Sequence, residues 1–295
     1  MPALEKLAAN FPVKLVVTQP DRPRGRGMEL ALSAVKQRAH ELGLPVTQPE
    51  KIKNNQEFRS QLAAISPDAI IVVGYGRIIP QWMLKLPRLG NINLHASLLP
   101  KYRGAAPIQW AIASGETLTG VTTMKIDAGL DTGDILLQHE VAIAPDDTAE
   151  TLAPRLAAPG ADLLVETLRG LEAGTIQPSP QDNAKATLAP ILKKEDGRID
   201  FRRTAQEICN RLRGFQPWPG AFTTFRGKSL QVWSAAVAER AIMPSELVVE
   251  DDQLLAGCRG NALVLLEVQL EGKKRMAARD FIHGYRPRSG EKLGE

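Results

Sequence analysis

Three side chains could together carry out acyl-transfer chemistry: Asn93, His95 and Asp131. Asn93 and His95 lie two residues apart in an apolar stretch that predicts a strand, so they point to the same side. An amide and an imidazole on one side can aim two hydrogen-bond donors at one oxygen, and an acid such as Asp131 can orient the imidazole or hold its charge. The spacing fits a capped strand end with a core histidine equally well.

An amine is the acceptor that this trio suits best. A free α-amino group has a pKa of about 7.7–8.0, so a usable fraction of it is already neutral at pH 7. The enzyme would then mainly stabilise an oxyanion and move a proton. The other common motifs are absent from the sequence, which contains no GxSxG, no P-loop and no GxGxxG. Cys209 and Cys258 form no CxxC pair, so we expect two reduced thiols and no metal site.

The elements that must position the trio alternate between strands and helices over the first part of the chain. Apolar runs predict strands at 13–17, 68–74, 89–94, 120–126 and 135–138, and helices at 2–9, 31–42, 54–65, 106–114 and 148–171. This alternation predicts an α/β, Rossmann-like and mostly parallel sheet, whose ligands sit beyond the carboxyl ends of the strands. Asn93 and His95 lie at such an end. Pro154 and Pro159 should kink or break the last helix.

The character of the sequence changes after residue 172. Residues 173–195 are rich in Pro, Gln, Asp and Lys and predict a linker. Beyond them, a helix at 205–212 and a last helix near 277–282 flank several short strands, which predict a small OB-like β-barrel. The strands are expected at 221–225, 229–234, 245–249, 253–257 and 262–268. The expected domains are thus 1–172 (catalytic), 173–195 (linker) and 196–295 (β-barrel).

Composition restricts the class of protein. An apolar fraction of 43% supports real cores, and the sequence has neither a membrane-length apolar run nor a secretory signal, so we expect a cytoplasmic protein. The chain has 37 Lys and Arg against 33 Asp and Glu, and the whole excess falls within residues 190–295. That imbalance favours a polyanionic partner for the last third, although a mildly basic solvated surface explains it as well.

Two long strings around the trio resemble the signatures of the folate-dependent formyltransferases. They are residues 93–110, NLHASLLPKYRGAAPIQW, and residues 127–136, DAGLDTGDIL. Within the family, the wider match is to the members that formylate initiator tRNA. It includes residues 18–23 with 25–27, 194–200, 213–221 and 284–287. The match covers nearly the whole chain, and strings of this length do not agree by chance.

The resemblance implies a formyl donor, 10-formyltetrahydrofolate, and an acceptor, the amino group of methionine on initiator Met-tRNA. It makes Asn93, His95 and Asp131 the catalytic trio. Asn93 and a charged His95 would hold the oxyanion of the tetrahedral intermediate. Asp131 would set the state of His95 and help to pass the amine proton toward the leaving nitrogen of the folate.

The resemblance also implies binding residues for both substrates. The folate site would be formed by Ser97, Leu98, Leu99 and Pro100, and by the strand end Val73, Gly74 and Tyr75. The tRNA would be contacted by the basic loop residues Arg22, Arg24 and Arg26 and by the turn residues Lys273, Lys274 and Arg275. Without the resemblance, both basic groups would be read as solvated surface. Glu29 stands where the family usually continues with lysines, which weakens the expected phosphate contact.

Two other functions remain open from the sequence. One is a related folate-dependent formyltransferase that acts on a sugar-nucleotide amine. The basic loop and the C-terminal domain argue against it. The other is a tRNA-binding protein inactivated by N-terminal truncation, against which the intact trio argues. No metal is expected, and a monomer is the default expectation.

The beginning of the chain departs from the family pattern. Family members start with a strand and a Gly-Thr-Pro turn before the helix that here begins at Pro2. A doubly wound sheet without that strand leaves backbone groups of its neighbours unpaired. The pattern favours a start assigned too late over a truncated enzyme.

A chain extended upstream is therefore expected to be more stable and more active than the 295-residue chain. The reason is that a first strand would pair with neighbours that otherwise have free edges. Melting temperature and kcat/KM of the two chains measure the effect. Equal values for both chains would refute the expectation.

Overall fold

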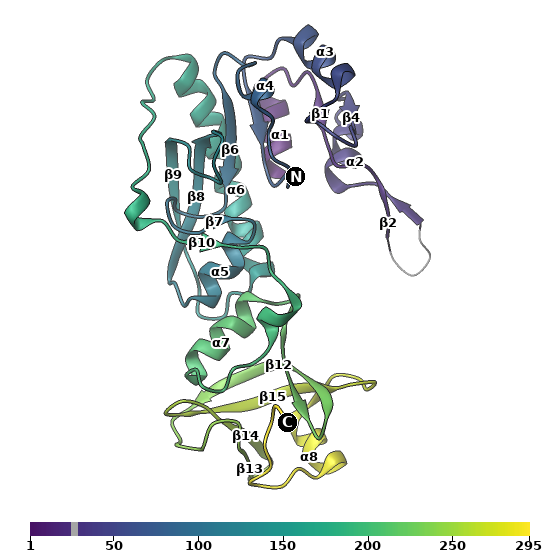
Figure 1. The fold of residues 1–295 in the computed structure, drawn as a ribbon, viewed down its shortest axis with the longest axis vertical. Helices are drawn as coiled ribbons and strands as arrows, with labels where there is room; N and C mark the ends of the chain where they lie inside the picture. Colours follow the sequence, from purple (N-terminus) through teal and green to yellow (C-terminus); the bar gives the residue numbers. More distant parts are fainter. Residues whose placement is uncertain (25–28) are drawn as a thin grey trace. The chain divides into compact units, whose positions relative to one another are not determined.

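The computed structural model describes residues 1–24 and 29–295 (Figure 1). The chain divides into two compact units. The first contains Met1–Pro107, Thr119–Ala142 and Pro154–Ala189, and the second contains Ile108–Leu118, Ile143–Ala153 and Pro190–Glu295. Arg26 lies outside the described residues.

The first unit begins with short alternating elements. They are α1 (Pro2–Asn10), β1 (Val16–Val17), β2 (Arg22–Arg24), β3 (Glu29–Ala31), α2 (Ala34–Glu41), β4 (Val46–Thr47) and α3 (Gln56–Ile65). Side-chain caps fix where two of the helices begin, because Ser33 accepts a hydrogen bond from the first turn of α2 and Asn55 from that of α3. β1 pairs with β4 in parallel, and β2 pairs with β3 in antiparallel orientation.

Four strands form the central sheet of this unit, in the order β5-β6-β8-β9. They are β5 (Ile70–Val72), β6 (Asn91–His95), β8 (Leu118–Lys125) and β9 (Ile135–Ala142), and the short elements α4 (Gln81–Leu84), β7 (Arg103–Gly104) and α5 (Pro107–Ala113) lie between them in sequence. β5 and β6 are parallel, whereas β6 and β8 are antiparallel. The predicted α/β fold with parallel strand pairs is confirmed.

The strands β1 and β4 form a sheet of their own. In Figure 1 they lie beside α2 and α3, whereas β6, β8 and β9 lie together beside α6 (Ala149–Glu172). Within the part of the chain that the structure describes, β1 pairs only with β4, and β5 pairs in a ladder only with β6. One edge of β1 and one edge of β5 therefore have no strand partner among these residues.

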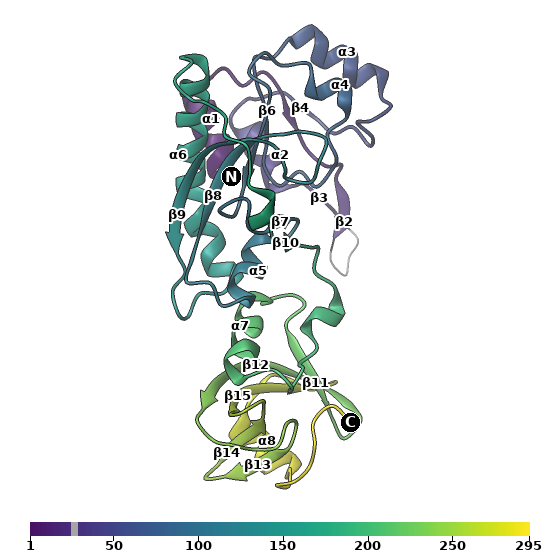
Figure 2. The ribbon, with the colours of Figure 1, turned by 60° about the vertical axis from the view of Figure 1, so that its left-hand side comes forward.

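Helix α6 is continuous, and the predicted break at its prolines does not occur. Pro154 and Pro159 both lie inside the helix. A proline in a helix costs about 3 kcal/mol or more, but burying one leucine contributes about 1.5–3 kcal/mol. Leu156, Leu164 and other residues of α6 are almost completely buried. Several buried leucines thus outweigh the two prolines. Figures 1 and 2 both show α6 running along β8 and β9.

The second unit is built on a six-stranded antiparallel sheet with the order β11-β12-β15-β14-β13, and β16 pairs with β15. Its elements are η2 (Lys194–Gly197), α7 (Ala205–Gly214), β11 (Ala221–Phe225), β12 (Lys228–Ala238), β13 (Leu247–Glu250), β14 (Gln253–Gly257), β15 (Ala262–Leu270), β16 (Met276–Ala277) and α8 (Ala278–Tyr285). The core is one cluster in which Phe281 of α8 and Leu230 of β12 are fully buried. The predicted helices and strands are all present.

The predicted barrel is not closed. Among the described residues, no ladder joins the end strands β11 and β13. The last residues of the chain use these edges instead. Leu247 of β13 donates its N–H to the carbonyl of Glu291 (2.7 Å), and the N–H of Gly294 donates to the carbonyl of Thr224 in β11 (2.9 Å). An irregular C-terminal segment thus satisfies backbone groups that strand pairing would satisfy in a closed barrel.

Two glycines of the second unit should respond to alanine in opposite directions. At Gly214 in α7, an added Cβ would lie 2.6 Å from the carbonyl oxygen of Gln109, whereas at Gly284 in α8 it would meet nothing within 4 Å. Gly214→Ala should destabilise the unit, since overpacking costs about 1–3 kcal/mol. Gly284→Ala should stabilise it by about 0.5–1 kcal/mol. Thermal unfolding followed by circular dichroism measures both effects, and shifts of the same sign would contradict the expectation.

Candidate active site

The imidazole of His95 lies at the carboxyl end of β6 and is only 5% exposed. Its Nε2 lies 2.9 Å from the carbonyl oxygen of Tyr102, and its Nδ1 lies 3.8 Å from Oδ2 of Asp131. A carbonyl oxygen only accepts hydrogen bonds, so Nε2 must carry a proton in this contact. Nδ1 is therefore the ring atom that can gain or lose a proton, and it faces a carboxylate.

The carboxylate of Asp131 is held from a second side. Its Oδ2 accepts a hydrogen bond from the backbone N–H of Gly104 at 2.9 Å. Asp131 and Tyr102 both have left-handed backbone conformations, with φ values of 52° and 61°. Such conformations cost of order 1–3 kcal/mol for a residue other than glycine and persist only where the surroundings fix them. The backbone near His95 is thus specifically shaped on both sides of the ring.

The loop that carries Asp131 folds on its own side chains. Asp127 Oδ1 accepts hydrogen bonds from the N–H of Gly129 (3.0 Å) and from the hydroxyl of Thr132 (2.8 Å). Gly129 cannot carry a larger side chain, because an added Cβ would lie 2.0 Å from the hydroxyl oxygen of Thr132. These contacts turn the chain between β8 and β9 so that Asp131 comes close to His95.

Asn93 is half-buried and lies on β6 between Val72 of β5 and Met124 of β8. In the described ranges 1–24 and 29–295, its side-chain amide has no hydrogen-bond partner. Asn91, on the same face of β6, differs: its amide nitrogen donates to the carbonyls of Met83 (2.9 Å) and Leu84 (3.2 Å). Asn91 is therefore engaged in packing, whereas the amide of Asn93 is available to a bound molecule.

The expected folate residues fall into two groups. Ser97, Leu98, Leu99 and Pro100 follow His95 directly, but Ser97 and Leu99 are buried. The Ser97 hydroxyl donates to the carbonyl of Lys101 (2.6 Å), and the N–H of Leu99 donates to the Thr122 hydroxyl (3.2 Å). These two residues hold the shape of the loop, so any contact with a ligand must come from other atoms of the segment.

The second group, Val73, Gly74 and Tyr75, follows β5, the parallel neighbour of β6. Val73 is 48% exposed. Burial raises the pKa of the Tyr75 phenol, so it is neutral at pH 7. Its buried hydroxyl has no hydrogen-bond partner among the residues that the structure describes. Because parallel strands end at the same edge, this group and His95 share one edge of the sheet.

The expected tRNA contacts belong to different units. Arg22 is exposed and begins β2, and Arg24 ends it. Lys273, Lys274 and Arg275 are exposed in the second unit. Arg275 pairs with Glu267 and stacks over Trp233 at 5.0 Å, so its charge already has a partner. Lys273 and Lys274 remain the more accessible cations of that turn.

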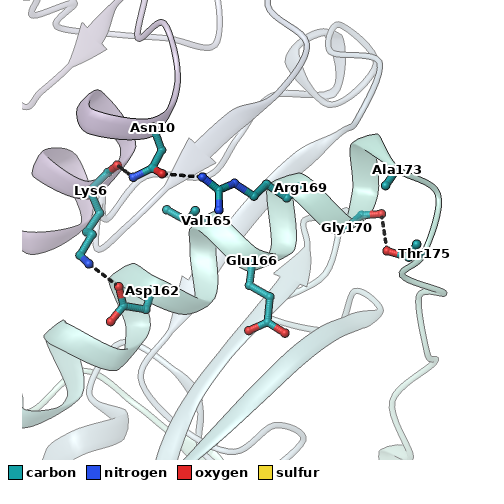
Figure 3. A pocket seen from close by; sticks show the side chains of 9 residues that line it. All are labelled: Lys6, Asn10, Asp162, Val165, Glu166, Arg169, Gly170, Ala173 and Thr175. Atoms are coloured by element: carbon teal, nitrogen blue, oxygen red, sulfur yellow. Dashed lines mark hydrogen bonds and ion pairs between the residues drawn. The ribbon is translucent and has the colours of Figure 1, made fainter.

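An open groove of about 580 Å³ lies between α1 and α6, away from these residues (Figure 3). Its polar groups are largely paired. Lys6 forms an ion pair with Asp162 (2.7 Å), and Arg169 donates to the side chain of Asn10 (2.7 Å). Among the described residues, no cluster of acidic, histidine or cysteine side chains could hold a metal ion, and no helix is long and apolar enough to cross a membrane.

Sequence reasoning missed two backbone groups of the site: the carbonyl of Tyr102 and the N–H of Gly104. Both belong to the matched signature, but no side-chain pattern marks a backbone donor or acceptor. Gly104 alone carries a signal. Its φ is +126°, and an added Cβ would lie 2.5 Å from the carbonyl oxygen of Ala189, so only glycine fits there.

Comparisons with known proteins agree on one family. The family described as formyl transferase matches residues 2–168, and its C-terminal domain matches residues 191–286. Methionyl-tRNA formyltransferase of Koribacter versatilis is 70% identical over 100% of this chain and 95% of its own length. The protein of the same name from Acidobacterium capsulatum is 63% identical over 96% of this chain and 93% of its own length.

Two solved structures share the fold at lower identity. A sugar 3N-formyltransferase, WlaRD, is 19% identical with a TM-score of 0.64, and the match covers 92% of this chain and 94% of that one. HypX from Aquifex aeolicus, solved with tetrahydrofolic acid, is 20% identical with a TM-score of 0.59. That match covers 91% of this chain but only 46% of HypX.

The protonation of His95 can be checked directly. In the neutral ring the proton should sit on Nε2, because the carbonyl of Tyr102 only accepts. Long-range ¹H–¹⁵N NMR of the ¹⁵N-histidine-labelled protein distinguishes the two tautomers. The chain has 4 histidines, so a His95→Gln variant assigns the signal. A neutral His95 protonated on Nδ1 would contradict the geometry.

Proposed function

The chain belongs to the formyl transferase family, and on this premise we propose that it transfers the formyl group of 10-formyltetrahydrofolate to the methionine amino group of initiator Met-tRNA, for translation initiation. The acceptor is supported by relatives named methionyl-tRNA formyltransferase, at up to 70% identity over the whole chain. The observation that carries the chemistry is the buried His95, held between a carbonyl and the Asp131 carboxylate beside the unpaired amide of Asn93.

The reaction exchanges one carbon–nitrogen bond for another and moves one proton between the two nitrogens. The amine nitrogen attacks the formyl carbon, the bond from that carbon to the folate nitrogen breaks, and the proton that the amine loses passes to the leaving nitrogen. Negative charge develops on the formyl oxygen in between. A donor directed at that oxygen lowers the barrier, and removal of one such donor typically costs about 10²–10³ in kcat.

Asn93 fits the role of the oxyanion donor, and a charged His95 fits that of a positive charge beside the oxyanion. The amide of Asn93 needs no internal bond to be broken before it binds the oxygen. His95 in its charged form has two N–H groups, of which Nε2–H is already bound to the carbonyl of Tyr102. The charge spreads over the ring and stabilises a nearby anion, and the Asp131 carboxylate balances it from the Nδ1 side. The positive charge of His95 is therefore buried beside a negative charge that balances it.

Asp131 also lies where a proton could be passed. It faces Nδ1, the ring nitrogen that the carbonyl of Tyr102 leaves free. At 3.8 Å the pair is longer than a hydrogen bond, and contacts of this kind often tighten when the substrate is bound. We assign to Asp131 the tasks of setting the charge state of His95 and of accepting and releasing the transferred proton.

The binding residues follow the same proposal. The donor would occupy the sheet edge formed by Val73, Gly74 and Tyr75 and by the segment Ser97–Pro100, and the chemistry would require no metal. The phosphate backbone of the tRNA would meet Arg22, Arg24 and Arg26 and the turn Lys273–Arg275. We retain the division into a catalytic domain (1–172), a linker (173–195) and a tRNA-binding domain (196–295), and a monomer acting in the cytoplasm.

One assay tests the proposal. The purified chain, 10-formyltetrahydrofolate and charged initiator tRNA should yield formylmethionine, and His95→Ala should lower kcat/KM by about 10²–10⁴, the usual contribution of a general acid–base residue. His139→Ala is the matched control, because His139 is exposed on β9. A loss below about tenfold for His95→Ala would refute its role.

Product with a sugar-nucleotide amine but none with tRNA would refute the acceptor, and tight tRNA binding without turnover would refute the activity.

A further inference from the structure

Residues 181–189, which we call the strap, follow helix α6 in sequence and precede Pro190, where the second unit resumes. They contact both halves of the candidate site. The strand β10 (Leu188–Ala189) pairs with β7 in parallel. The hydroxyl of Thr187 accepts a hydrogen bond from the N–H of Tyr102 at 2.8 Å. The strap thus holds the segment that supplies the carbonyl bound to His95 and the N–H bound to Asp131.

One side chain of the strap extends the contact to the catalytic loop. The amide nitrogen of Gln181 donates to the carbonyl of Asp131 (2.9 Å) and to that of Gly133 (2.7 Å). Its amide oxygen accepts from Nε of Arg103 (3.0 Å) and from a terminal nitrogen of the same guanidinium (2.7 Å). Both ends of the amide are therefore used, and they join Arg103 to the loop that carries Asp131.

Arg103 makes this link rigid. Its side chain is only 7% exposed, and a second amide oxygen, that of Asn183, accepts from it at 2.9 Å. The η1 turn (Asn183–Lys185) that presents Asn183 begins directly after Gln181 and Asp182. Hydrogen bonds to a charged donor are stronger than neutral ones, so the orientation of the Gln181 amide is well defined. The amide cannot rotate by half a turn without placing its NH₂ group against the guanidinium.

We propose that Gln181 is a positioning residue that holds Asp131 in place for its work with His95. The backbone of Asp131 is left-handed, and Gln181 holds its carbonyl while the N–H of Gly104 holds its carboxylate. Without the two amide donors, the loop loses two of the contacts that fix this conformation, and the carboxylate moves away from Nδ1. The expected effect on catalysis rests on the proposed function, whereas the contact between Gln181 and Asp131 does not.

Gln181→Glu is the most informative variant. It keeps an oxygen for Arg103 and nearly the same shape, but it removes both donors and places a carboxylate against two carbonyl oxygens. We expect kcat to fall about 10–100-fold, since a misplacement of about 1 Å costs of order 10². KM for Met-tRNA should change less than about twofold. Gln177→Glu is the matched control, because it makes the same change at an exposed glutamine whose side chain has no hydrogen-bond partner among the residues that the structure describes.

A double-mutant cycle separates positioning from a general effect on folding. If Gln181 acts through Asp131, then Gln181→Glu should lower kcat less than about twofold in an Asp131→Asn background. An equal loss in both backgrounds would overturn the proposal, and so would an unchanged kcat of the single variant. The melting temperature of Gln181→Glu, compared with that of Gln177→Glu, identifies a variant that has simply lost its fold, in which case Gln181→Met repeats the cycle.

Amide hydrogen exchange tests the contact without any reaction. Gln181→Glu should speed exchange at the N–H of Gly104, which donates to Asp131, and leave strand β11 of the second unit unchanged. Unchanged exchange at Gly104 would overturn the proposal even if activity fell. If the wild-type chain forms no formylmethionine, the proposed function fails, and the exchange at Gly104 still decides whether Gln181 positions Asp131.

Discussion

A buried imidazole whose Nε2 is bound to a carbonyl and whose Nδ1 faces a carboxylate is the constraint on which the rest of the site depends. His95 is 5% exposed, so an unpaired ring nitrogen would cost about 1–3 kcal/mol. The carbonyl of Tyr102 satisfies Nε2 and leaves Nδ1 as the ring nitrogen that faces Asp131. Asp131 faces Nδ1, and its own position is set by the N–H of Gly104. A single ring orientation thus depends on three separate segments of the chain.

The segments reach the ring by different physical means. Strand pairing with β5 and β8 fixes β6 and with it the place of His95. Local side-chain bonds of Asp127 shape the loop of Asp131. The segment from Tyr102 to Gly104 has little regular structure and is held by the parallel strand β10, more than 80 residues later in the chain (Thr187 to Tyr102, a separation of 85). Bringing together segments so far apart in sequence costs conformational entropy, which several hydrogen bonds between them must offset.

The sequence predicted those parts of the molecule that depend on local pattern. The strand ending at His95, the acid in the loop between β8 and β9, the α/β alternation and the strands of the second unit follow from periodicity and turn residues. The predicted OB-like barrel is left open because the C-terminal residues near Glu291 and Gly294 occupy the strand edges, and no periodicity predicts which partner an edge takes. Of the kink or break expected from the prolines of α6, the break does not occur, because burial outweighed the prolines. Gln181 was read as part of a linker, since a glutamine among prolines gives no pattern, and its role depends wholly on tertiary contacts.

The unpaired edges of β1 and β5 affect the two parts of the site differently. His95 and Asp131 are held through β6, β8, β7 and β10, none of which depends on β1. Val73, Gly74 and Tyr75 instead extend β5, whose second edge has no strand partner within the described residues. A strand added along that edge would contact the end of β5 before it affected the imidazole. With the donor bound at Val73–Tyr75 as proposed, such a strand should change affinity for the formyl donor more than the proton transfer proposed at Nδ1, so the two properties are separable in a single kinetic series.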